Sequence, residues 1–164
     1  MGTPYARRFL GECGAPDKDA AKHGEIMILA APAIILTAAV TLLAILISIG
    51  LQINTGKVRG RTGIKPPAMS GAPALEAALR AEGNTVEQYV LFLPALWLAA
   101  LYFQGWVPPL VGLVWCLGRV LYAIGYMTAP DKRYPGYMLT VLSALVLIVL
   151  AVIGLVSAWG ASAA

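Results

Sequence analysis

Four long stretches of the chain are apolar and almost free of charge. They cover residues 26–51, 88–106, 107–130 and 137–158, and Arg119 in the third is the only charged residue among them. A membrane-spanning helix needs about 20 mainly apolar residues to cross about 30 Å of hydrocarbon, and each stretch is long enough. The strict alternation typical of barrel strands is absent. The pattern therefore predicts four membrane-spanning helices.

The segments between and around these stretches are rich in turn residues. Proline and glycine before residue 74 predict that the second helix restarts there, so the expected helices cover residues 26–51, 74–106, 107–130 and 137–158. Residues 1–25 contain four basic and four acidic residues and predict an irregular N-terminal arm, for which docking on a larger membrane complex is one role. The first apolar stretch is too long for a signal peptide, so we expect it to remain as an anchor. Residues 159–164 form a short tail.

The composition agrees with a membrane protein. Of the 164 residues, 59% are hydrophobic and 12% are charged, whereas soluble domains are about 25% charged. This excludes a soluble globular domain and gives no reason to expect nucleic-acid binding. Cys13 and Cys116 lie far apart and His23 is alone, so no metal site is expected. We expect one all-α unit in which four helices form a bundle.

The distribution of basic residues predicts an orientation, because positive residues are retained on the cytoplasmic side of a membrane. Two connections and the helix starts beside them hold seven of the twelve basic residues, against four in the N-terminal arm. The loops 52–79 and 130–136 are therefore expected to be cytoplasmic, with both termini on the opposite side. In a prokaryote this membrane would be the inner membrane. The seven residues are Lys57, Arg59, Arg61, Lys65, Arg80, Lys132 and Arg133.

Polar residues inside the helices fall on two stripes. The stripe on the second helix consists of Arg80, Asn84 and Glu87, at positions i, i+4 and i+7. The stripe on the third helix consists of Arg119, Tyr122 and Tyr126, at positions i, i+3 and i+7, and Arg133 follows in the next connection. Because the two helices run antiparallel, the stripes should meet in the cytoplasmic half of the bundle and form a polar pocket there.

Two interpretations of these stripes are open. In the first, Glu87 and Arg119 form a buried structural ion pair and the tyrosines anchor the helices at the membrane interface. In the second, the surplus of positive charge binds an anionic hydrophilic ligand, while the surrounding hydrocarbon admits a lipid-soluble one. A proton or ion pathway is disfavoured, because no polar residue continues the stripes through the other half of the bundle.

At these residues the chain resembles the MAPEG family, the membrane-associated proteins in eicosanoid and glutathione metabolism. The resemblance rests on the run from Arg80 to Glu87, on Leu91-Phe-Leu-Pro-Ala-Leu-Trp97, and on the run from Gly118 to Tyr126 with Arg133. It covers roughly residues 26–158. It implies a four-helix bundle assembled as a homotrimer in membrane lipids, with glutathione bound as cosubstrate between adjacent subunits.

The resemblance also implies roles for single residues. The residues implied to hold glutathione are Arg80, Asn84, Glu87, Arg119, Tyr122 and Tyr126, with Arg59 reaching the ligand of the neighbouring subunit. Arg133 matches an arginine that activates the thiol. Three positions depart from the family pattern: Gln88 replaces a glutathione-contacting tyrosine of the leukotriene-forming synthase, Glu82 replaces Gln or His, and Gly60 replaces a second loop arginine.

Two functions follow as alternatives. The first is a glutathione-dependent membrane transferase or peroxidase that acts on a hydrophobic electrophile. The second is a non-catalytic member of the same fold, either a lipid-binding protein or an accessory subunit of a larger membrane complex. Retention of Arg133 favours the enzyme, whereas Gln88 and the N-terminal arm favour the second alternative.

Overall fold

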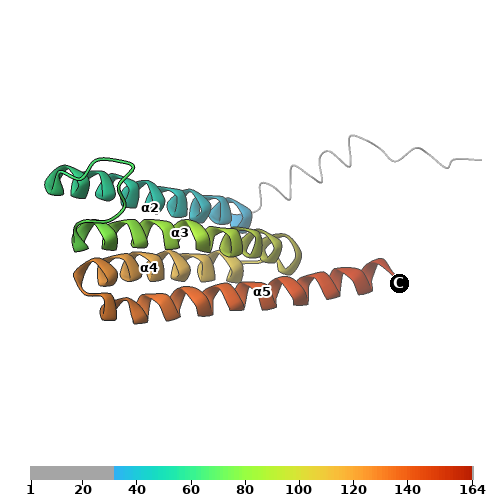
Figure 1. Cartoon of the computed structure of the whole chain (residues 1–164). Coiled ribbons are helices and arrows are strands. Elements are labelled where there is room, and N and C mark those ends of the chain that lie inside the picture. Colours follow the sequence, from blue (N-terminus) through green and yellow to red (C-terminus); the bar gives the residue numbers. More distant parts are fainter. Residues whose placement is uncertain (1–31, 164) are drawn as a thin grey trace, which may run out of the picture. The chain divides into compact units, whose positions relative to one another are not determined.

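The computed structural model describes residues 32–163, and every regular element in that range is a helix. Four long helices lie side by side, with successive helices antiparallel (Figure 1). They are α2 (Pro32–Thr62), α3 (Pro73–Leu98), α4 (Val107–Thr128) and α5 (Tyr134–Ser162), with a π-helical turn η1 (Ala99–Phe103) and a 3-10 turn η2 (Pro130–Arg133). The expected all-α, four-helix bundle is confirmed. The expectations for the N-terminal arm and for residues 26–31 lie outside the described residues.

The helices extend beyond the apolar stretches that predicted them. α2 continues past residue 51 to Thr62, a further length of about 16 Å at 1.5 Å per residue. It ends at Gly63, whose φ of 71° is left-handed and whose N–H donates to the Arg59 carbonyl at 2.9 Å. The connection to α3 is therefore residues 63–72, shorter than the expected loop 52–79. At the other end of the chain α5 runs to Ser162, so most of the expected tail is helical.

Large side chains fill one part of the bundle, which we call the distal core. Phe92 of α3 stacks on Trp115 of α4, with ring centroids 3.8 Å apart and planes 5° from parallel. The other buried members are Val40, Ala44, Ala95, Leu96, Ala99, Cys116, Ala144, Leu147 and Ala151. A second cluster, the proximal core, consists only of Leu51, Ala81 and Ala123. Small residues there leave room between the helices.

Glycines bring α4 and α5 into backbone contact beside the proximal core. A Cβ atom placed on Gly136 would collide with the backbone of Tyr122, and one on Gly125 would collide with the Lys132 carbonyl. A Cβ atom on Gly118 would lie 2.9 Å from the Thr140 methyl group. Gly118 and Gly125 therefore allow α4 to approach α5 and η2 closely. Gly136 fixes the start of α5 directly against α4.

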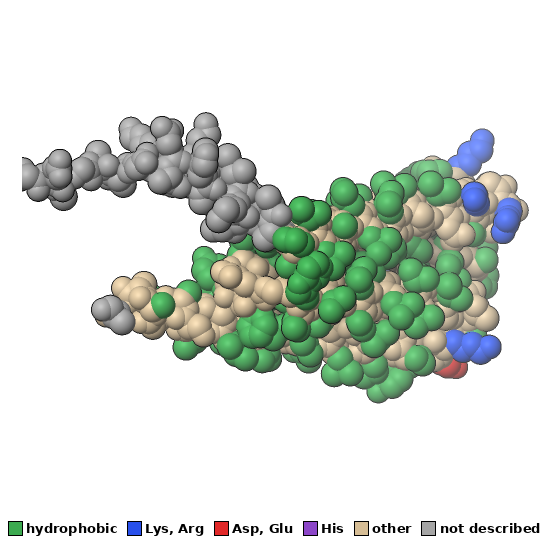
Figure 2. All heavy atoms as spheres, turned by 180° about the vertical axis from the view of Figure 1, so that it is seen from behind, with side chains coloured by type: hydrophobic (Ala, Val, Ile, Leu, Met, Phe, Trp, Pro, Cys, Tyr) green, Lys and Arg blue, Asp and Glu red, His purple; other side chains and the backbone are tan. Residues whose placement is uncertain are grey.

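Lysine and arginine side chains gather at one end of the described bundle, while apolar side chains cover the rest of the face in Figure 2. This basic end is formed where α2 ends, where α3 begins and where α4 connects to α5. All four helices, α3 together with η1, are long and apolar enough to cross a membrane. The basic residues thus lie at one end of the apolar spans, next to the proximal core.

Candidate functional site

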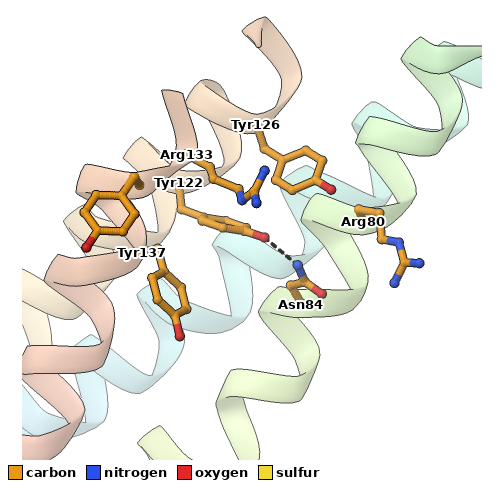
Figure 3. Close-up of a pocket in the computed structure, with 7 residues that line it drawn as sticks. Arg80, Asn84, Tyr122, Tyr126, Arg133 and Tyr137 are labelled. Atoms are coloured by element: carbon orange, nitrogen blue, oxygen red, sulfur yellow. Dashed lines mark hydrogen bonds between the residues drawn. The ribbon is translucent and has the colours of Figure 1, made fainter. Parts of the chain in front are cut away.

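The main pocket opens at the basic end, between α3, α4 and α5. Its volume is about 550 Å³, and Figure 3 shows the side chains from these helices and from η2 that surround it. It is lined by Arg80, Asn84, Tyr122, Tyr126, Arg133, Tyr134 and Tyr137. Five of these are residues that the sequence analysis selected. The two polar stripes therefore meet as predicted.

A direct hydrogen bond joins the stripes. The Asn84 side-chain amide donates to the phenol oxygen of Tyr122, across the α3–α4 interface (Figure 3). The Tyr122 and Tyr126 rings follow one another along α4, with centroids 5.7 Å apart. The Arg133 guanidinium lies 5.3 Å from the centre of the Tyr126 ring, within range of a cation–π contact. A continuous series of contacts therefore runs from Asn84 through Tyr122 and Tyr126 to the exposed Arg133.

A smaller inner lobe of about 210 Å³ reaches toward Arg119. It is lined by Asn84, Glu87, Gln88, Arg119, Tyr122 and Tyr137. Arg119 is only 1% exposed, and its Nη2 donates to Thr85 Oγ1 at 2.8 Å. Its guanidinium carbon lies 4.3 Å from the centre of the Tyr122 ring. Glu87 and Arg119, the last predicted stripe residues, thus share one cavity.

Arg119 is a buried cation whose hydrogen bonds are incomplete. Within residues 32–163 its Nε has no hydrogen-bond partner, and its guanidinium contacts Thr85 and the rings of Trp115 and Tyr122. In this part of the chain Glu87 and Arg119 do not form an ion pair, so the interpretation of both as a structural pair is wrong. A buried charge without a counter-ion is costly, and an anionic ligand in the inner lobe would supply one.

An outer pocket of about 460 Å³ lies on the other side of α3, against the α2–α3 connection. It is lined by Met69, Ser70, Glu76, Leu79, Arg80, Gly83, Asn84 and Glu87. Arg80 and Asn84 therefore line both this pocket and the main one. The stripe on α3 is accessible from two directions.

Arg59 is the predicted site residue that lies outside these three pockets. Its Nη1 donates to the Ala68 carbonyl at 2.8 Å and to the Ile64 carbonyl at 3.4 Å. Within this chain Arg59 holds the α2–α3 connection against the end of α2. Its expected contact with the ligand of a neighbouring subunit stays a prediction.

The sequence analysis missed Tyr134, Tyr137 and Thr85. The two tyrosines lie three residues apart, directly after Arg133, and this spacing on a helix start was a usable signal. Thr85, fully buried beside Asn84, gave no signal because a threonine inside an apolar helix commonly bonds its own backbone, as Thr85 also does through the Ala81 carbonyl.

The fold and the pocket define a class: a four-helix integral membrane protein with a basic, phenol-rich site at one end. Comparison with known proteins gives the family. The MAPEG family model matches residues 37–153, and the chain belongs to this family.

Three relatives illustrate the range of similarity. An uncharacterized protein of Synechocystis is 44% identical over 112 residues, 68% of this chain and 82% of that protein. Human microsomal glutathione S-transferase 2 is 39% identical over 106 residues, 65% of this chain and 72% of that protein. Leukotriene C4 synthase of Cavia porcellus is 32% identical over 122 residues, 74% of this chain and 81% of that protein.

Proposed function

We propose that this protein is a glutathione-dependent membrane transferase that joins the glutathione thiolate to a hydrophobic electrophile. The names of two relatives, a glutathione S-transferase and a leukotriene C4 synthase, support this choice of ligand. The observation that carries it is the buried Arg119, which has an unused donor and no carboxylate partner within residues 32–163. An anionic peptide such as glutathione supplies the missing negative charge.

The charges around the pockets are complementary to glutathione, which carries two carboxylates, one amine and one thiol. Arg80 and Arg119 bind the carboxylates, because guanidinium groups form strong charge-assisted hydrogen bonds with them. Glu87 binds the amine. Asn84 and Tyr122, already joined to each other, bind the peptide groups between them, and Tyr126 completes this wall of the pocket.

Arg133 is the residue proposed to activate the thiol. A thiol of pKa near 8.5 is only about 3% thiolate at pH 7. A nearby guanidinium that lowers this pKa by about two units makes roughly 75% of it thiolate, about 25-fold more nucleophile. Arg133 is exposed at the edge of the main pocket, next to Tyr126, where an incoming electrophile can meet the sulfur.

The assembly and orientation are parts of the same proposal. In a homotrimer, Arg59 of one subunit would reach the glutathione of the neighbouring subunit, as the family resemblance implies. The basic end would face the cytoplasm, because that is where basic residues beside membrane spans are retained. Glutathione is water-soluble, so it would enter from that side, while the electrophile would come from the lipid.

Glutathione titration of the purified, detergent-solubilised protein tests the proposal. We expect a higher melting temperature with glutathione and an ultraviolet absorbance band of bound thiolate. Arg133→Ala should keep the thermal stabilisation and lose the thiolate band, while Lys132→Ala, the adjacent control, should keep both. Absence of both signals in the wild type would refute glutathione binding. Stabilisation without thiolate would instead support the non-catalytic, lipid-binding alternative.

A further inference from the structure

Tyr137, near the start of α5, lies where the main pocket meets the inner lobe. It lines both cavities, as do only Asn84 and Tyr122 among the described residues. In Figure 3 its ring lies on the opposite side of Tyr122 from Tyr126, with the hydroxyl pointing away from Arg133. Within residues 32–163 this hydroxyl has no hydrogen-bond partner. It is a free donor at the junction of the two cavities.

The backbone holds Tyr137 in place. The preceding residue, Gly136, is in such close contact with Tyr122 that even one added carbon would collide with its backbone. The Thr140 hydroxyl donates to the Tyr137 carbonyl at 2.8 Å. The position of the phenol is therefore determined by helix packing before any ligand arrives, which lowers the cost of using it.

An apolar stripe on α5 leads from the lipid-facing surface to Tyr137. Val141, Leu145 and Ile148 follow it at i+4, i+8 and i+11 and so share its face of the helix. Leu145 is 52% and Ile148 is 42% exposed. A lipid-soluble molecule that moves along this stripe from the membrane reaches the Tyr137 hydroxyl as its first polar contact.

The other phenols of the main pocket are placed differently. The Tyr122 oxygen accepts from Asn84, and the Tyr126 ring is covered by the Arg133 guanidinium. Tyr134 lines the main pocket but not the inner lobe, and it is 63% exposed, against 41% for Tyr137. Tyr137 is the phenol that combines a free hydroxyl with contact to both cavities and to the apolar stripe.

We propose that Tyr137 protonates the oxygen of the hydrophobic electrophile, and that this electrophile is an α,β-unsaturated carbonyl compound. This rests on the proposed glutathione transferase function. The thiolate forms a bond to the β-carbon, the C=C electron pair shifts to make an enolate, and the Tyr137 hydroxyl gives its proton to the enolate oxygen. The proton that the thiol lost is held by water and returns from there to the Tyr137 phenolate. The enol then tautomerises to the carbonyl product.

Two probe substrates separate this role from a structural one. A long-chain enal such as nonenal needs a proton at its oxygen when sulfur adds. Chlorodinitrobenzene loses chloride instead and needs no such proton. Proton transfer by a positioned side chain contributes typically about 100-fold or more, so in Tyr137→Phe the kcat/KM for the enal, divided by that for chlorodinitrobenzene, should fall at least tenfold. Tyr134→Phe is the matched control, in which the ratio should stay within about twofold.

The outcomes are distinguishable. An equal loss of both activities in Tyr137→Phe, an unchanged ratio, or a wild type that accepts chlorodinitrobenzene but no enal would each overturn the role of Tyr137 and leave glutathione transfer standing. A wild type that conjugates neither probe would contradict the proposed function itself. The same fall in Tyr134→Phe would show that the effect is not specific to Tyr137 and would also overturn the assignment.

Discussion

The distal and proximal cores are built by the same helices with side chains of different size. On α4, Trp115 fills the distal core, while Ala123, about two turns later on the same face, belongs to the proximal core. On α3, Phe92 and Ala81 differ in the same way across about three turns. One end of the bundle is therefore closely packed and the other is hollow.

This difference separates the part of the bundle that is closely packed from the part that has room for the proposed ligand. In a membrane, helices associate mainly through close packing and interhelical hydrogen bonds, because lipid tails are as apolar as the side chains. Phe92 and Trp115 supply that packing. The alanines of the proximal core leave space that Arg119, Asn84 and Tyr122 line with polar groups. Packing in the distal core therefore offsets the stability that the bundle loses by lining a space with polar groups in its proximal part.

The largest expected effect comes from removing an aromatic ring in the distal core. Phe92→Ala takes away the ring stacked on Trp115 and should lower the free energy of unfolding by about 3–5 kcal/mol. Leu91→Ala, its neighbour on α3, is 56% exposed and should cost less than about 1 kcal/mol. Denaturant unfolding in detergent micelles measures both. Equal losses would mean that the distal core is not the stabilising region.

The next largest effect is expected at the close contact between Gly136 of α5 and the backbone of Tyr122 of α4. Gly136→Ala places a carbon against the backbone of Tyr122 and should destabilise the protein by about 2–3 kcal/mol, with weaker glutathione-dependent stabilisation. Gly56→Ala is the matched control, because that helical glycine has open space around it and should gain roughly 0.5–1 kcal/mol. Thermal melts with and without glutathione measure these changes. Similar melts for the two variants would contradict the close approach.

The smallest effect is expected at Arg119, where a substitution should change glutathione affinity without lowering the stability of the unliganded protein. Arg119→Met replaces a buried guanidinium by a shorter, unbranched apolar chain and should weaken glutathione binding by about 2 kcal/mol, roughly 30-fold. The unliganded variant should be as stable as the wild type or slightly more so, because no carboxylate loses a partner. Isothermal titration calorimetry and unfolding curves test the two parts. A large loss of stability without ligand would make Arg119 a structural residue.

The sequence alone was sufficient to predict the two polar stripes that line the site. Helical spacing placed Arg80 with Asn84 and Arg119 with Tyr122, and antiparallel helices brought the stripes together, because both arguments depend only on periodicity and chain direction. Tyr137 was not predicted, since a tyrosine at the start of a membrane span has an equally good interpretation as an interface anchor. Its role depends on Gly136, and a close backbone contact between two helices has no periodic signal.

The end of α2 and the position of Arg59 could not be read from hydrophobicity. Residues 52–62 are mostly polar, so the apolar pattern stops at residue 51, whereas backbone hydrogen bonds carry the helix to Thr62. Arg59 donates hydrogen bonds to the Ile64 and Ala68 carbonyls. A pattern of residue types cannot predict such bonds, because every residue has a main-chain carbonyl. Local backbone geometry, rather than side-chain type, determines this part of the bundle.

Trp115 gives the molecule an internal optical probe. Its indole is fully buried against Phe92, and the centre of its ring lies 5.9 Å from the guanidinium carbon of Arg119. Trp97, by contrast, is half-buried, and Trp106 and Trp159 are exposed. The Trp115 chromophore therefore lies at the boundary between the packed and hollow halves, next to the charge that a ligand would neutralise. With the other three tryptophans replaced by phenylalanine, its emission would report the electric field of the site without an added label.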